Sequence, residues 1–377
     1  MDFGKLFLEK KIIIAAAVYF FISGILLYKY GIQLSGEAEK YIDNANRILH
    51  QQELRNGFFG IFYFSYSLIV SFFIRLSVDL VFVAIVQIVV SFIAAISLYK
   101  ILLHTLENKT VSFLFFCAYL LCYPIQKWNY FLYSESIHTS FLVIGIYLLL
   151  RALQLKKITQ WMAFGLMALA IIFSRPVGII FLFSFVLVLI AWLYRNDKRK
   201  GAIGLSILGL AAVIGIMNTP ITSFINPDSL KRMEVICQLP ESNANINYQE
   251  FNKAGLYKAY LVIKNEIGMG NFFMTGFKKL GSFFGMYRGY YSWQNNLLLL
   301  LHCIFYPFVI LGIFSKQKGQ FYYIRLLSIL YLLFTTMVIF FTCDDWANRF
   351  ISPAFPFILI LAASGFLNMY KKLSKSG

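Results

Sequence analysis

The sequence predicts an all-α polytopic membrane protein with about ten transmembrane helices and juxtamembrane helices on the outer face. The first observation is composition, because 59% of the 377 residues are hydrophobic and the mean hydropathy is +0.70. The second is that several runs of about 18 or more residues are almost free of charge, which is the length a helix needs to cross a bilayer. The third is that these runs are continuous rather than alternating, so helices are the expected spanning structure.

The apolar runs place the spans along the chain. The first run is too long for a signal-peptide core and lacks a cleavage site, so we expect a retained first span. The stretch 57–76 is aromatic-rich but interrupted by Ser65, Ser67 and Arg75, which favours a juxtamembrane or re-entrant helix pair. The chain, 1–377, should form a single integral membrane domain with a first outer loop at 33–78 and a long outer loop at 222–295. We expect spans at 12–30, 79–99, 110–126, 139–154, 160–175, 177–194, 202–221, 296–315, 323–342 and 352–370.

Charge sets the predicted orientation. The formal net charge is +17, and Lys and Arg concentrate in the short loops. If 57–76 does not cross the membrane, these loops all fall on one side, as the positive-inside rule expects of the cytoplasm. We therefore expect a multi-pass protein of the cell (inner) membrane with both termini cytoplasmic and its active face extracytoplasmic. Because this topology accounts for the excess of basic residues, we expect no nucleic-acid partner. The basic loop residues are Lys5, Lys10, Lys11, Lys100, Lys109, Arg151, Lys156, Lys157, Arg195, Lys198, Arg199, Lys200, Lys316, Lys318, Lys371, Lys372 and Lys375.

The first outer loop opens with the acidic stretch "SGEAEKYID". On a helix that starts near Ser35, Glu37 lies near the N-terminus, while Glu39 and Asp43 share one face with a spacing of four residues. Glu37 is a candidate catalytic residue, and Tyr41 lies on the following turn. The alternative is structural, because an acid at a helix start is also favoured by the helix dipole and by capping.

Two further stretches of the predicted outer face carry ionisable side chains. Glu135 and His138 lie in "YFLYSESIHTSF" at the mouth of the fourth span, where an ionisable group is costly unless it faces a cavity or a partner. Arg175 lies in "IIFSRPVGIIF" between two apolar runs, and Arg suits an oxygen anion such as phosphate. The structural alternatives are N-capping by the Ser-Glu-Ser cluster and snorkelling of Arg175 to the interface.

The stretch "TCDDWANRFISP" supplies Asp344, Asp345 and Arg349. Two adjacent acids could bind a divalent cation, but neighbouring side chains diverge on a helix, so a chelating pair is not implied. The four histidines show no metal-ligand spacing. Cys237 and Cys343 fall in polar loops, where a disulfide between them is a geometric possibility.

Taken together, these stretches resemble the GT-C superfamily of membrane glycosyltransferases. The residues that carry the resemblance are "EAEKYIDNA", "YSES", "SRPVG" and "NRFISPAFPFILILAA". The pattern is most similar to bacterial members of the dolichyl-phosphate-mannose-protein mannosyltransferase and lipid A aminoarabinose transferase type, over residues 12–202 and 344–366. The first-loop acid is Glu where Asp is usual, and the proline-rich element expected near residue 62 reads "FYFSYSLIV".

The resemblance implies transfer of a sugar from a polyprenyl-phosphate donor to a glycan, lipid or protein acceptor on the outer face. Carried over by position, Glu37 is the catalytic base, and Arg175 and Arg349 hold the donor phosphate or balance charge. Glu135 belongs to the "YSES" motif at the mouth of the fourth span, which we call the mouth motif. Tyr41 and His138 complete the candidate substrate-binding residues. No cofactor is required, although a divalent cation at Asp344 and Asp345 stays open.

The chemistry of glycosyl transfer needs the same residue types. A carboxylate must take the proton of the attacking hydroxyl, and cations must hold the charge of the departing phosphate. An O-antigen or capsule polymerase is the enzymatic alternative, and it would rely on Arg232 or Arg288 of the long loop. A lipid-linked glycan flippase or transporter is the alternative of another class, but it would be expected to show repeated halves.

Overall fold

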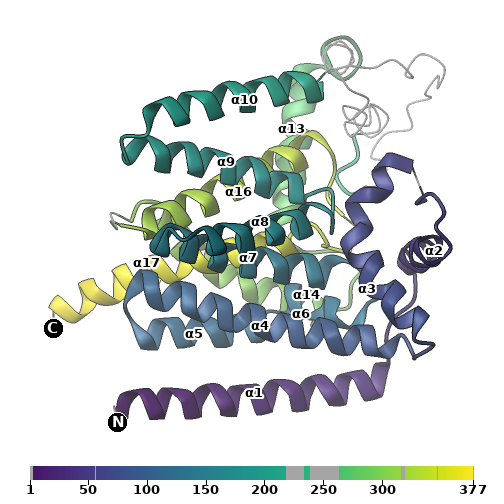
Figure 1. Cartoon of the computed structure of the whole chain (residues 1–377), viewed down its shortest axis with the longest axis horizontal. Helices are drawn as coiled ribbons and strands as arrows, with labels where there is room; N and C mark the ends of the chain where they lie inside the picture. Colours follow the sequence, from purple (N-terminus) through teal and green to yellow (C-terminus); the bar gives the residue numbers. More distant parts are fainter. Residues whose placement is uncertain are drawn as a thin grey trace. The chain divides into compact units, whose positions relative to one another are not determined.

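The computed structural model describes residues 3–55, 57–217, 233–237, 263–315, 319–345 and 347–376. These residues are helical, without a sheet, so the predicted fold class is confirmed (Figure 1). The α-helices are α1 (Phe3–Tyr30), α2 (Ala38–Leu49), α3 (Phe64–Arg75), α4 (Val81–Leu106), α5 (Lys109–Leu120), α6 (Tyr123–Gln126), α7 (Glu135–Leu155), α8 (Ile158–Ile172), α9 (Gly178–Arg195), α10 (Arg199–Met217), α13 (Met269–Gly285), α14 (Trp293–Leu300), α15 (Tyr306–Ile313), α16 (Phe321–Phe341) and α17 (Phe355–Ser376). The other helical turns are η1 (Gly57–Tyr63), η2 (Lys127–Tyr130), η5 (Ile263–Ile267), η6 (Leu301–Phe305) and η7 (Ser352–Ala354).

Within the described residues, seven helices are long and apolar enough to cross a membrane, or up to eight if one bent pair counts as a span. Seven of the ten predicted spans correspond to these helices. The bent pair, Lys109–Leu120 with Tyr123–Tyr130, turns by 46° within the predicted span 110–126. The predicted span 160–175 is α8, which has only 15 residues because the "SRP" turn ends it early. The predicted span 202–221 is α10, which borders a part of the chain outside the description.

The chain divides into two compact units, which we describe separately. Unit 1 consists of residues 1–182, 305–325 and 355–377, and unit 2 of residues 183–304 and 326–354. The first loop, 33–78, forms α2, η1 and α3 in unit 1. Residues 222–232 and 238–262 of the long loop lie outside the described residues. The later part of the loop contains α13 and the first residues of α14.

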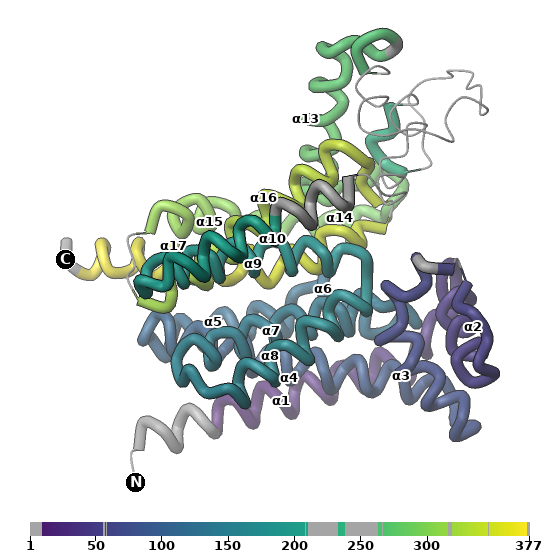
Figure 2. The backbone as a smooth tube through the Cα atoms, turned by 45° about the horizontal axis from the view of Figure 1, so that its top comes forward, coloured from purple at the N-terminus to yellow at the C-terminus, as the bar shows by residue number. Residues whose placement is uncertain are grey.

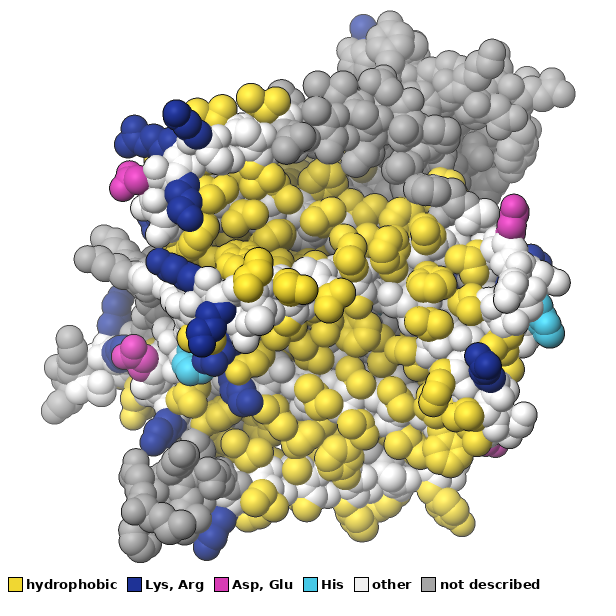
Figure 3. All heavy atoms as spheres, in the orientation of Figure 1, with side chains coloured by type: hydrophobic (Ala, Val, Ile, Leu, Met, Phe, Trp, Pro, Cys, Tyr) yellow, Lys and Arg dark blue, Asp and Glu magenta, His cyan; other side chains and the backbone are white. Residues whose placement is uncertain are grey.

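One end of unit 1 carries basic residues. The Lys11 ammonium on α1 lies 6.0 Å from the ring centre of Phe113 near the start of α5. The Lys100 ammonium near the end of α4 lies 5.6 Å from the ring centre of Tyr147 in the second half of α7. The starts of α1 and α5 are therefore at the same end as the ends of α4 and α7. Figure 3 shows many Lys and Arg side chains along one edge of the molecule, beside a broad hydrophobic face.

The opposite end of unit 1 holds the first loop. Gln87, near the start of α4, donates from Nε2 to the carbonyl oxygens of Asn129 and Phe131, both at 3.0 Å. Its Oε1 accepts a hydrogen bond of 2.8 Å from the Tyr66 hydroxyl on α3. Gln33, just after α1, forms an isolated bridge with Phe131. These bonds fix the loop against η2 and the residue that follows it, with α2 and α3 side by side (Figure 2).

Candidate active site

The backbone before α2 is clamped by Tyr133. The Tyr133 hydroxyl donates to the Ser35 carbonyl oxygen at 2.8 Å and accepts from the Glu37 backbone N–H at 3.1 Å. Gly36, between them, has φ +68°, which glycine adopts without strain. A Cβ on Gly36 would lie 2.3 Å from the Tyr133 hydroxyl, so only glycine fits this close approach. The clamp sets the position at which Glu37 starts the helix.

The Glu37 side chain is half-exposed and paired with a cation. Its exposed fraction is 40%, and its Oε2 lies 3.0 Å from Nζ of Lys40 one turn later. Lys40 in turn lies over the ring of Tyr63, 3.9 Å from its centre. Glu37 is the N-cap residue of α2 by position, but its side chain forms no capping hydrogen bond. The carboxylate is therefore not used to cap the helix.

Tyr41 anchors α2 on the other segments of unit 1. It is fully buried, and its hydroxyl shares a 3.0 Å hydrogen bond with Ser134 Oγ. Its ring meets that of Tyr66 edge to face, with 4.9 Å between the centres. Burial raises the pKa of Tyr41 well above its ordinary value, and the nearby Glu135 carboxylate raises it further. The hydroxyl thus stays protonated and acts as a structural link.

Glu135 and Arg175 form a buried ion pair. Glu135 is the first residue of α7, and Arg175 lies in the turn between α8 and α9. Glu135 Oε1 lies 2.8 Å from Nη1 of Arg175, with side-chain exposures of 0% and 7%. Arg175 therefore points into the protein rather than snorkelling to an interface, and Glu135 holds its charge in place.

His138 lies one turn after Glu135 and is also buried. Its Nδ1 lies 2.7 Å from Ser174 Oγ, while that hydroxyl donates to the Ile171 carbonyl oxygen at 2.7 Å. Because the Ser174 proton is used in that bond, Nδ1 of His138 must be the donor. Its Nε2 then carries a lone pair that has no hydrogen-bond partner among the residues described. Unit 1 thus brings together Glu37, Tyr41, Glu135, His138 and Arg175.

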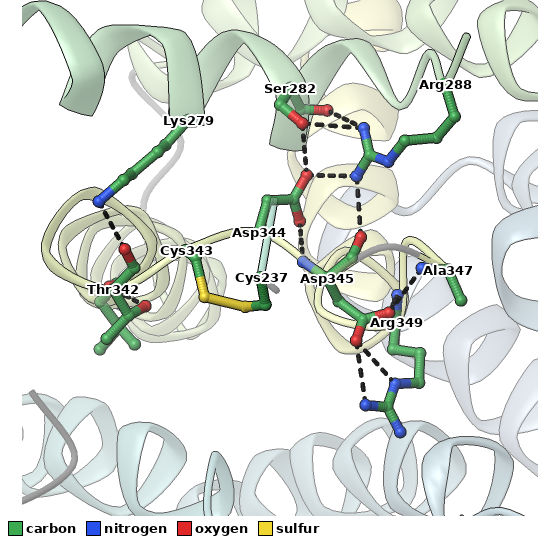
Figure 4. Close-up of a disulfide and its surroundings, with 11 residues drawn as sticks. Cys237, Lys279, Ser282, Arg288, Thr342, Cys343, Asp344, Asp345, Ala347 and Arg349 are labelled. Atoms are coloured by element: carbon green, nitrogen blue, oxygen red, sulfur yellow. Dashed lines mark hydrogen bonds and ion pairs between the residues drawn. A yellow bond between two sulfur atoms is a disulfide. The ribbon is translucent and has the colours of Figure 1, made fainter. Parts of the chain in front are cut away.

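Asp344, Asp345 and Arg349 lie in unit 2, between α16 and α17, and each acid has its own arginine (Figure 4). Asp344 pairs with Arg288, and Asp345 lies 3.0 Å from Arg349. Burial raises the pKa of Asp344, and Arg288 opposes that shift. No group of three or more His, Cys, Asp or Glu side chains within the described ranges could hold a metal ion. The two acids thus act here as ion-pair partners.

Arg288 forms its hydrogen bonds inside unit 2. It is fully buried and bonds to Asp344, to Ser282 Oγ at 2.8 Å and to the Asp345 carbonyl oxygen at 3.0 Å. A disulfide joins Cys237 to Cys343, the residue before Asp344, as Figure 4 shows. Arg232, the other arginine of the polymerase alternative, lies outside the described residues.

Several residues of the site were not predicted. Lys40 follows Glu37 by three residues, a spacing at which helical side chains meet, so the sequence held that signal. Tyr133 and Ser174 act through partners about 35 to 100 positions away in the chain, and no local pattern reveals such pairs.

The comparison with known families covers the later part of the chain. Residues 257–377 match the model of the Alg9-like mannosyltransferase family, which includes Asp344, Asp345 and Arg349 but not the first loop. No curated protein matches the chain. The resemblance to GT-C glycosyltransferases is confirmed by this match, which makes the later part of the chain similar to the Alg9-like mannosyltransferases, and the described helices make the chain a multi-pass membrane protein.

Proposed function

We propose that the protein transfers mannose from a polyprenyl-phosphate donor of the dolichyl-phosphate-mannose type to a hydroxyl group of a lipid-linked glycan. The family match supports the sugar, the donor and the acceptor class. One observation carries the chemistry: Glu37 presents a half-exposed carboxylate that is paired with Lys40 and does not cap its helix. A carboxylate that is fixed but reachable is what a general base needs.

In this mechanism Glu37 takes the proton of the acceptor hydroxyl as its oxygen attacks the anomeric carbon. The bond from that carbon to the donor phosphate breaks, and the phosphate leaves with the electron pair. Once Glu37 is protonated, Lys40 loses its counter-ion while negative charge grows on the phosphate. Lys40 therefore supplies positive charge at the stage when the leaving group needs it.

Arg175 has a different place in the proposal. Its ion pair with Glu135 leaves the buried pair neutral overall, so it contributes an oriented dipole rather than a free charge. Tyr41 and His138 hold the surrounding segments through their hydrogen bonds to Ser134 and Ser174. Arg349, bound to Asp345, balances charge in unit 2.

We further propose that the active face is extracytoplasmic and that both termini are cytoplasmic. In unit 1 the basic residues gather at the end opposite the first loop, in line with the positive-inside rule. The disulfide offers independent support, because disulfides persist in oxidising compartments. Cys343 lies in the link 342–354 that leads into the start of α17, and the basic Lys371 and Lys372 follow at its end.

Replacing Glu37 by Gln tests the base directly. Glu37→Gln should abolish transfer of mannose from a polyprenyl-phosphate donor while the amount of protein in the membrane stays unchanged. Glu39→Gln is the matched control, since Glu39 is exposed on the same helix and should keep normal activity. Full activity in Glu37→Gln would remove the proposed base. Loss of activity at Arg288 with normal stability and indifference at Glu37 would favour a polymerase.

A further inference from the structure

A groove of about 800 Å³ runs along α1 in unit 1. Its other wall is formed by α5, α6 and η2. On α1 the groove extends from Lys11 to Tyr30, which is about 28 Å at 1.5 Å per helical residue. This is close to the thickness of the hydrocarbon core of a bilayer, about 30 Å. The groove therefore follows a lipid-sized path along one helix.

The walls of the groove are mostly apolar. The lining residues that carry this property are Ile14, Val18, Ile22, Phe113, Leu120 and Leu121. Of these, Ile14, Val18, Ile22 and Leu121 are 45% or more exposed, so the described residues do not cover them. Near the middle, the Tyr19 hydroxyl donates to Gln126 Oε1 at 2.9 Å, which holds α1 to the second wall and leaves the groove open beside it.

The two ends of the groove differ. One end reaches Lys11, in the basic part of unit 1. The other end is lined by Gln33, Gln126, Lys127 and Tyr130 and therefore combines amides and a hydroxyl with one cation. The Nε2 atoms of Gln33 and Gln126 already donate to the carbonyl oxygens of Tyr30 and Tyr119. Lys127 is therefore the group that supplies the positive charge for a single phosphate.

The polar end is connected directly to the first loop. The Gln33 backbone N–H donates to the Tyr130 carbonyl oxygen at 2.7 Å, and Leu132 donates back to the Gln33 carbonyl oxygen at 3.0 Å. Glu37 follows Gln33 by four residues. The end of the groove that carries Lys127 therefore lies beside the segment that presents the proposed base.

We propose that this groove binds the isoprenoid chain of the polyprenyl-phosphate donor, with the phosphate at the Lys127 end. The inference rests on the proposed function. One long apolar path with a single cation at the end nearest Glu37 matches a single apolar chain that ends in one phosphate. A pyrophosphate-linked acceptor lipid would bring more negative charge than one lysine balances.

The kinetic test fills the groove and compares two donors. Ala15→Trp places a large ring in the groove, while Ala17→Trp on the same helix is the control because Ala17 is exposed and does not line it. One donor carries a long polyprenyl chain and the other a two-isoprene chain, each with mannosyl phosphate. Ala15→Trp should raise KM for the long donor about tenfold, as expected when two buried methylene groups lose their contacts. It should leave the short donor unchanged, whereas Lys127→Gln should raise KM for both. An equal effect of Ala15→Trp on both donors, or none on either, overturns the proposal.

A binding test separates this proposal from the proposed function. A sugar-free polyprenyl phosphate with a photoreactive group in its chain reports occupancy without any transfer. In wild-type protein we expect labelling on α1 and α5, and less in Ala15→Trp. Labelling spread evenly over other membrane-facing helices, displaced equally by phosphatidylglycerol, would show bulk lipid and overturn the proposal. Stronger competition by a pyrophosphate-linked lipid would also overturn it, in favour of the acceptor. If neither donor supports transfer but the label stays on α1 and α5, the proposed function fails and the lipid groove stands.

Discussion

Breaking the buried pair of Glu135 and Arg175 should have a large effect on stability. The two groups are 2.8 Å apart with exposures of 0% and 7%, so removing either charge takes from the other an ion-pair partner at a site with little water. Removing one partner of such a pair typically costs about 3–5 kcal/mol. Since proteins are typically stable by only about 5–15 kcal/mol, Glu135→Gln alone should lower the yield of folded protein clearly.

The double variant Glu135→Gln/Arg175→Gln separates structure from catalysis. With both charges gone, neither group is buried without compensation, and most of the lost stability should return. If the dipole of this pair also stabilises the departing phosphate, activity should not return with it. Loss of one electrostatic contact to a transition state costs about 100-fold in kcat, and we expect the refolded double variant to stay slower by that factor.

The assay is a double-mutant cycle on purified protein in mixed micelles. Unfolding by sodium dodecyl sulfate gives the free energies, and initial rates are divided by the folded fraction. Costs that simply add, with no coupling between the two substitutions, would show that the ion pair does not form and would refute the reasoning. A double variant with normal kcat would restrict the pair to a structural role.

Three more predictions concern single features. Gly36→Ala should lower kcat by about 100-fold, because it displaces the backbone that carries the proposed base. The control is Gly31→Ala, since Gly31 also has a positive φ (62°) but nothing lies within 4 Å of its Cβ; it should cost about 1–2 kcal/mol of stability and keep a normal kcat. Equal kinetics in the two variants would contradict the clamp. Cys343→Ser should lower stability by about 2–5 kcal/mol, because it removes a disulfide between positions 106 residues apart. Cys303→Ser, which changes a free cysteine, should leave stability unchanged. Unfolding curves under non-reducing conditions measure both variants, and identical curves would refute the stabilising role of the disulfide. Burial lowers the pKa of Lys279 to about 8 from 10.5. Between these two pH values the unfolded chain binds more protons than the folded one, so the free energy of unfolding should rise with pH by up to about 1.4 kcal/mol per pH unit. Lys279→Met should remove this pH dependence, and a dependence that persists would exclude Lys279 as its cause.

The sequence was sufficient for the fold class because apolar length is a local property. Runs such as those of α1, α4 and α16 are long enough to span on their own, and no partner is needed to recognise them. The count was less accurate, since α8 ends after 15 residues and α5 bends into α6 at a break of four residues or fewer. Both features depend on how a turn packs on neighbouring helices, which hydropathy does not report.

The candidate residues were easier to find than their roles. Glu37, Glu135 and Arg175 stood out because charge is rare beside apolar runs. Whether Arg175 snorkels outward or pairs inward depends on Glu135, 40 positions earlier in the chain, and two local patterns cannot show that they meet. For the same reason the pairing of Asp344 with Arg288 was not foreseen, and a divalent cation at the two acids stayed an open alternative.

Three consecutive residues, Tyr133, Ser134 and Glu135, explain why the mouth motif belongs with the first loop. Tyr133 clamps the backbone at Glu37, Ser134 binds the hydroxyl of Tyr41, and Glu135 holds Arg175. Each thus fixes a different part of the site from one rigid helix start. Because a displacement of about 1 Å can cost about 100-fold in rate, a base on a loop needs such external support. The tripeptide therefore acts as a positioning element for the proposed base, and only its last residue also controls a charge.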